Sequence, residues 1–195
     1  MTLTLIAAAV ALLFGCAGPM LVVSNFKSDY QPRTRTVAIA PLANHSNRDE
    51  GAAAARTIRE AMYRELTKHP DKYTVVVQDI AETDRRILAS GLSDSSLSDL
   101  SGIDLCKMFG ADAVMKGAVT RYEKYVTGSD FANAASALFH TVDSEVTVDL
   151  PIFDGTDGKP VFHYLFTADG DLVNERDKML NKLGSQLAKQ FPYRE

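Results

Sequence analysis

Apolar and polar residues alternate along the chain with two periodicities, one typical of helices and the other typical of strands. The run TVAIAP at 36–41 is short and apolar, which predicts a buried strand. Between 50 and 68 the apolar residues, from Ala55 to Leu66, fall on one helical face and predict an amphipathic helix. A second β-rich run at 73–78 follows, so the chain opens as β-α-β, a crossover that is almost always right-handed.

The same periodicities continue to the C-terminus. They predict helices at 79–89 and 97–109, strands at 113–125, 142–153 and 161–167, and a last helix from Leu172 to Phe191. The DGTDG sequence at 154–158 joins the last two strands as a hairpin turn. The order β-α-β-α-α-β-β-β-α predicts an α/β (α+β) fold, a two-layer sandwich with a mixed β-sheet.

The N-terminus carries an uncharged apolar run from Leu3 to Phe14. It is too short to span a bilayer, which takes about 20 residues, but it has the length of a signal-peptide core. The sequence Leu13-Phe14-Gly15-Cys16 resembles a bacterial lipobox, which implies cleavage between Gly15 and Cys16 and a lipid on Cys16. Ala17, in place of an aspartate, favours the outer membrane. The alternative is a hydrophobic helix buried in the domain.

This interpretation divides the chain into three parts. Residues 1–15 are expected to be a signal peptide, 16–33 a lipidated N-terminus and tether, and 34–195 a periplasmic α/β domain. A fully extended tether over 17–33 would reach about 55 Å at ~3.3 Å per residue. The domain could then stand clear of the lipid headgroups.

Composition agrees with one globular domain, since 46% of the residues are apolar and 24% are charged. The net charge is −4, and Lys and Arg are scattered along the chain. Nucleic-acid binding needs a basic face, so we expect no nucleic-acid partner.

Residues with catalytic or metal-binding chemistry are sparse. The four histidines form no metal-ligand spacing, and Cys106 lies in an apolar helical pattern typical of a core residue. Asp149 and Glu145 are the one nearby carboxylate pair on a common strand face, and they are expected to be solvated. We therefore expect no catalytic residues, no metal and no cofactor, and we interpret the chain as a binding or assembly protein.

One segment, Val126–His140, is small and apolar although it lies between two strands. Its candidate interface residues are Phe131, Ala135, Leu138 and Phe139. An apolar surface of this kind suggests contact with a partner or a membrane. A short helix that covers the sheet edge is the equal alternative.

Three segments carry a resemblance to a known superfamily: VAIAPLANHSN, FGADAVMKGAVTRYEKY and VTVDLPIFDGTDGKPVF. Together with the lipobox and the terminal helix, they resemble the lipoproteins that include CsgG of curli secretion, PelC of exopolysaccharide export and LpoB, an activator of penicillin-binding proteins. The resemblance covers about 160 residues in order. It implies a domain related to the N-terminal domain of TolB, and rings at the outer membrane in CsgG and PelC.

The resemblance implies a function in the cell envelope. The chain is expected to be an outer-membrane-anchored periplasmic lipoprotein, a homo-oligomer or partner-bound part of an export or secretion complex. The alternatives are a monomeric adaptor that activates a cell-wall synthase, as LpoB does, and an envelope enzyme that acts on peptidoglycan or polysaccharide. Membrane-spanning hairpins of the CsgG kind need two strands of about 9 to 11 residues each, and Val126–His140 and Phe166–Leu172 are too short for them.

Overall fold

A mixed β-sheet forms the centre of the molecule in the computed structural model, which describes residues 20–127, 141–170 and 176–195. The strand order is β1 (Met20–Val22), β8 (Pro160–Gly170), β7 (Thr141–Asp154), β5 (Ala113–Met115), β2 (Thr36–Ile39) and β4 (Val76–Val77). Off this path, β6 (Ala118–Thr127) pairs with β7 and with β3 (Ala43–Asn44). The β4-β2-β5 strands are parallel, whereas β5, β6 and β8 each pair antiparallel with β7.

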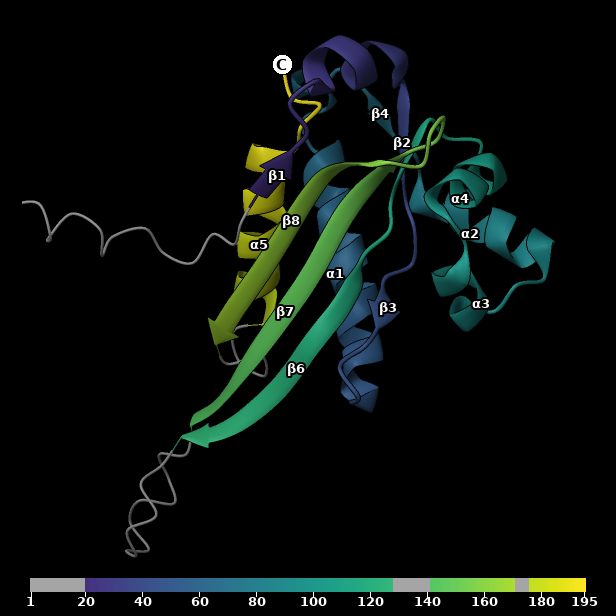
Figure 1. The fold of residues 1–195 in the computed structure, drawn as a ribbon. Helices are drawn as coiled ribbons and strands as arrows, with labels where there is room; N and C mark the ends of the chain where they lie inside the picture. The colour runs from purple at the N-terminus through teal and green to yellow at the C-terminus, as the bar shows by residue number, and fades with distance from the viewer. Residues whose placement is uncertain (1–19, 128–140, 171–175) are drawn as a thin grey trace, which may run out of the picture.

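Helices cover both faces at different ends of this sheet. Helices α1 (Asp49–Thr67) and α5 (Arg176–Gln190) lie side by side on one face, where they enclose the larger core. Helices α2 (Ile80–Ser90), α3 (Asp94–Asp99) and α4 (Gly102–Phe109) bury a smaller core on the other face, at the parallel strands (Figure 1). The α/β sandwich with a mixed sheet is thus confirmed, with α2 to α4 as an added layer at one end.

The amphipathic pattern of α1 is the reason why this helix lies on the sheet. Ile58 and Met62 are fully buried against β2 residues such as Ile39. Arg56 and Glu60, on the other side of the helix, are exposed. Burial of each large aliphatic side chain contributes about 1.5–3 kcal/mol, which outweighs the weak helix propensity of a single residue.

Two expected elements are broken by local capping and crowding. The helix expected over 97–109 ends after Asp99, and α4 begins after Ser101, whose Oγ accepts a hydrogen bond from the Asp104 N–H at 3.2 Å. The strand expected over 113–125 breaks at Gly117, where a Cβ would lie 2.7 Å from the Asp149 carbonyl oxygen. The chain therefore leaves β2 and continues as β6 beside β3.

Residues 20–33 differ from the tether expected for 16–33. Met20 to Val22 pair antiparallel with β8, and the turn that follows buries Phe26 and Tyr30 to 3% and 5% exposure. Arg33 then forms an ion pair with the buried carboxylate of Asp154 at 2.7 Å. The aromatic residues and the β1–β8 pairing thus hold residues 20–33 on the domain.

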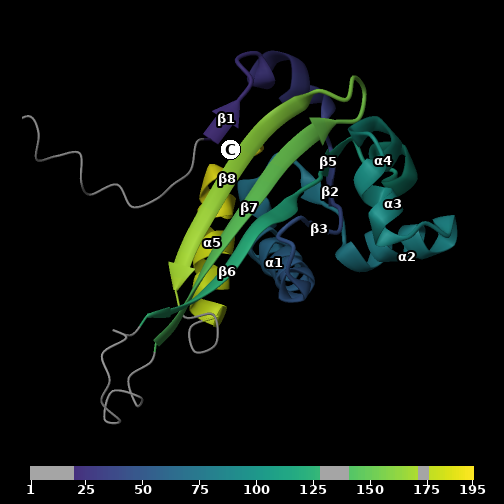
Figure 2. The same ribbon diagram turned by 60° about the horizontal axis from the view of Figure 1, so that its bottom comes forward.

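The three long strands β6, β7 and β8 form a curved part of the sheet, which we call the blade. Figure 2 shows that the blade is the longest part of the sheet and that β6 and β7 continue beyond the helices. Its inner face, toward α1 and α5, carries buried side chains such as Val146, Val148 and Phe166. Polar side chains alternate with them on the outer face.

Candidate functional site

The candidate lipidation and interface residues fall outside the described residues. Gly15 and Cys16 precede Met20, and Phe131, Ala135, Leu138 and Phe139 lie between β6 and β7. The structure does describe the strands that flank the interface segment, and Thr127 pairs with Thr141 directly on either side of it. The segment is therefore carried at the end of the blade, and its role stays a prediction.

The carboxylate pair on the outer face of the blade is bound to basic side chains. Asp149 Oδ1 lies 2.6 Å from His163 Nε2, and Glu145 Oε1 lies 2.9 Å from an Arg121 nitrogen. Arg121 also contacts Glu123 at 3.0 Å. The Asp149 side chain is 38% exposed and the Glu145 side chain is 19% exposed, so both carboxylates lie at the surface with a basic partner.

The DGTDG turn is organised around Asp154, which is 1% exposed. Its Oδ1 accepts hydrogen bonds from the backbone N–H groups of Thr156 and Asp157, and both of its oxygens bind Arg33, at 3.1 and 2.7 Å. The turn prediction is confirmed. Asp154 fixes the hairpin and the N-terminal segment at once.

Cys106 is a core residue, as the sequence predicts. It belongs to α4, is 3% exposed and packs in the smaller core. Burial raises the pKa of its thiol to about 12, so the reactive thiolate is disfavoured. Within the described ranges, no cluster of three or more His, Cys, Asp or Glu residues could hold a metal ion.

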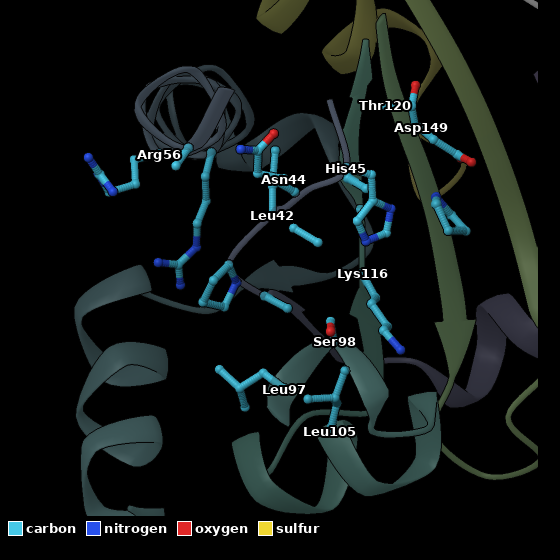
Figure 3. A pocket seen from close by; sticks show the side chains of 18 of the residues that line it. Leu42, Asn44, His45, Arg56, Leu97, Ser98, Leu105, Lys116, Thr120 and Asp149 are labelled. Atoms are coloured by element: carbon cyan, nitrogen blue, oxygen red, sulfur yellow. The ribbon is translucent and has the colours of Figure 1, made fainter. Parts of the chain in front are cut away.

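A cleft of about 620 Å³ opens where the parallel strands end (Figure 3). The chain leaves β2 at Pro41 and β5 at Lys116, and both residues line the cleft. The chain runs from β2 to β4 on one side of β2 and then from β4 to β5 on the other side, so the strand order reverses beside β2 and the cleft lies at a topological switch point. Open α/β sheets bind ligands at this position as a rule.

The cleft is lined by both apolar and polar side chains. Leu97 and Leu105, from α3 and α4, form one wall. Leu42 faces them across the cleft, and His45 and Lys116 lie on the same side as Leu42 (Figure 3). Lys116 Nζ donates to the Leu100 carbonyl oxygen at 2.6 Å. This composition resembles small-molecule sites, which combine an apolar surface with a few polar groups.

Arg59 of α1 joins the elements around the cleft. Its side chain is 9% exposed, and its Nε and Nη2 atoms donate to the Ile39 carbonyl oxygen at 3.1 and 3.0 Å. Its Nη1 contacts Asp84 of α2 at 2.6 Å. One guanidinium thus caps β2 and links α1 to α2, which fixes the geometry of the cleft.

Sequence reasoning missed this cleft because no local motif marks it. The residues that build it come from six separate stretches of the chain. The one available signal was the pair of breakers, Pro41 and Gly117, that follow two buried strands. Within the described part of the chain, no helix has the length and apolarity to cross a bilayer.

No protein-family model and no curated sequence matches the chain. Solved structures do match. Lipoprotein GNA1162 from Neisseria meningitidis aligns with a TM-score of 0.57 and 16% identity, over 80% of this chain and 96% of the other. The PelC dodecamer from Paraburkholderia phytofirmans gives 0.49 and 16%, over 92% and 96% of the two chains. The LpoB C-terminal domain from Salmonella enterica gives 0.43 and 12%, over 69% and 82%.

The alignment with lipoprotein GNA1162 bears on the fold of this chain. At identities of 16% and below the comparison concerns the fold. The chain thus has an α/β fold similar to that of lipoprotein GNA1162.

Proposed function

We propose that this chain is a lipid-anchored subunit of a cell-envelope assembly that acts by binding and not by catalysis. The observation that carries the proposal is the blade, whose two outer strands, β6 and β8, are flanked over a small part of their length by the other strands that the structure describes. Among these strands, β3 pairs with β6 at Ala118 and Val119, and β1 pairs with β8 from Phe162 to Tyr164. Long sheet edges are templates for pairing with another chain.

The direction of the strands favours a ring of identical subunits. Strands β6 and β8 both run antiparallel to β7, so they point the same way. Rotation about an axis along the blade would bring β6 of one subunit beside β8 of the next, as a parallel pair. Such a contact is heterologous, and heterologous contacts close into rings when the rotation fits.

The apolar segment at the end of the blade supports the same proposal. Phe131, Ala135, Leu138 and Phe139 would bury their side chains against a neighbouring subunit or an envelope partner. Aromatic residues are frequent anchors of such interfaces. An export or secretion complex at the outer membrane is the assembly that the superfamily resemblance implies.

One observation favours the alternative of a monomeric adaptor for a cell-wall synthase. Arg121 and Glu123 place charges on β6, and charged side chains on an outer strand are a known protection against edge pairing.

Membrane attachment is tested at Cys16. Replacement of Cys16 with Ser should remove the lipid and move the protein from the membrane fraction to the soluble fraction. Mass spectrometry of the parent protein should show the added acyl groups. A serine variant that stays on the membrane, with no lipid on the parent, would contradict the anchor.

Ring formation is tested by light scattering and by cross-linking of the detergent-solubilised lipoprotein. Arg121 and Thr167 share one row of the blade, through Thr147, so Arg121→Cys combined with Leu165→Cys, Thr167→Cys or Asp169→Cys samples three registers of a β6–β8 contact. One pair should give a ladder of disulfide-linked oligomers, and each single-cysteine variant should give no ladder. Phe131→Asp should reduce the particle to monomer, whereas a monomer at every concentration would support the adaptor.

A further inference from the structure

The N-terminal segment limits how far the domain can lie from a membrane. From Met20 onward the chain belongs to the domain, because β1 pairs with β8 and the Val23 N–H donates to the Val161 carbonyl oxygen at 3.2 Å. Phe26 is buried a few residues later. Any slack between a lipid on Cys16 and the folded domain is therefore confined to residues 17–19, which we call the leash.

The leash is short compared with the domain. Cys16 and Met20 are four residues apart, so their Cα atoms are separated by at most about 14 Å. A compact domain of this size is about 40 Å across by the usual scaling of radius with chain length. A lipid on Cys16 would hold β1 near the headgroups, and the far side of the domain could not turn to the membrane.

The surface beside the leash suits a lipid interface. Leu21 of β1 pairs with His163 and is 59% exposed. The other exposed large hydrophobic residues of the described chain, Val76, Leu88 and Leu92, belong to β4 and to α2 and the turn after it. These elements lie at the opposite edge of the sheet from β1. Leu21 is therefore the exposed aliphatic side chain that the leash would bring to the bilayer.

We infer that the β1 edge of the sheet is a membrane-docking surface, on which Leu21 enters the headgroup region of the bilayer that holds the lipid of Cys16. The inference rests on the proposed lipid anchor and adds an orientation to it. The stretch of the edge that β1 covers, beside Phe162 to Tyr164 of β8, would lie nearest to the membrane, and the rest of β8 would lie beside the neighbouring subunit. Helix α2 and its neighbours would lie farther from the lipid. The partner is the bilayer itself, since the leash is too short for another protein domain to fit between.

The test is a quenching measurement on the acylated full chain in vesicles of phosphatidylethanolamine and phosphatidylglycerol, with a quencher on the lipid headgroups. One dye is placed at Lys27→Cys, in the short helix Phe26–Tyr30 after β1, and a control dye at Leu88→Cys on α2, where Leu88 is 81% exposed. Cys106 is buried and should not react with the dye. We expect quenching at position 27 to exceed quenching at position 88 several-fold.

Two further variants separate the leash from the docking surface. A spacer of 20 Gly and Ser residues between Gly18 and Pro19 should reduce quenching at position 27, and Leu21→Asp in the spacer variant should reduce it to the level of position 88. Equal quenching at both positions in the native-length, vesicle-bound protein would overturn the docking surface while the lipid anchor stands. A parent protein that does not float with the vesicles would overturn the anchor and the inference together.

Discussion

Removal of the Arg59 guanidinium should weaken the fold far more than removal of a neighbouring arginine on the same helix. Two of its nitrogens bind the Ile39 carbonyl oxygen in a buried position, and hydrogen bonds to charged groups contribute about 1.5–3 kcal/mol. Asp84 is 49% exposed, so its ion pair adds about 0–1 kcal/mol. With the Ile39 carbonyl left without its donor, we expect Arg59→Ala to cost about 3 kcal/mol.

Urea or thermal unfolding of purified protein measures this cost. A loss of about 3 kcal/mol corresponds to a decrease in Tm of about 6–12 °C for a domain of this length. Arg56→Ala is the matched control, because Arg56 lies one turn earlier on α1, also lines the cleft and is exposed. Its effect should stay within about 0.5 kcal/mol.

A methionine at position 59 separates packing from hydrogen bonding. Arg59→Met keeps an apolar stem against the sheet but removes both donors. We expect a loss of about 2 kcal/mol, between those of the control and Arg59→Ala. If Arg59→Ala were no more destabilising than Arg56→Ala, the buried hydrogen bonds to Ile39 would not hold the cleft, and the reasoning above would be refuted.

Three other predictions concern a close approach, a thiol and an ion pair. Gly117→Ala should cost about 2 kcal/mol, because the added Cβ would lie 2.7 Å from a backbone carbonyl oxygen. Gly91→Ala should cost about 1 kcal/mol, because Gly91 has a φ of +70° but open space around it. Equal losses of stability in urea unfolding would contradict this. Cys106 should resist iodoacetamide until the protein unfolds. Because the pKa of its thiol in the folded protein is raised from 9.0 to about 12, the free energy of unfolding should decrease as the pH rises from 9 to 12. This decrease should be less steep in Cys106→Ala. Arg33→Ala should cost about 2 kcal/mol by leaving Asp154 buried without its cation, and a loss under about 0.5 kcal/mol in chemical unfolding would count against this role.

Periodicity predicted the elements whose burial is set by their own sequence. The helix expected at 50–68 is α1, and the strand expected at 142–153 is β7, because α1 and the part of β7 from Glu145 onward each have one buried face. The expected strand at 73–78 is reduced to Val76 and Val77. Its residues alternate correctly, but β2 offers only a short partner at that edge.

Features that depend on distant partners could not be predicted in this way. Residues 20–33 look like a linker in the sequence, yet Phe26 is buried and Arg33 binds Asp154, a residue far along the chain. The cleft likewise depends on the β2–β5 pairing and on the reach of Arg59 to Ile39. Local spacing contains no information about such contacts, which follow from the topology of the sheet.

The pairing of β1 with β8 has a consequence for the order of folding. Met20 and Tyr164 are neighbours in the sheet but lie near opposite ends of the chain, and contacts of such long sequence separation form late because closing the loop between them costs entropy. The β6–β7 and β7–β8 hairpins are local by comparison. During export the N-terminus would leave the translocation machinery first, while its partner strand was still unavailable. Cys16 would then be accessible to modifying enzymes on a slack chain, and completion of the sheet would draw the finished domain toward the lipid.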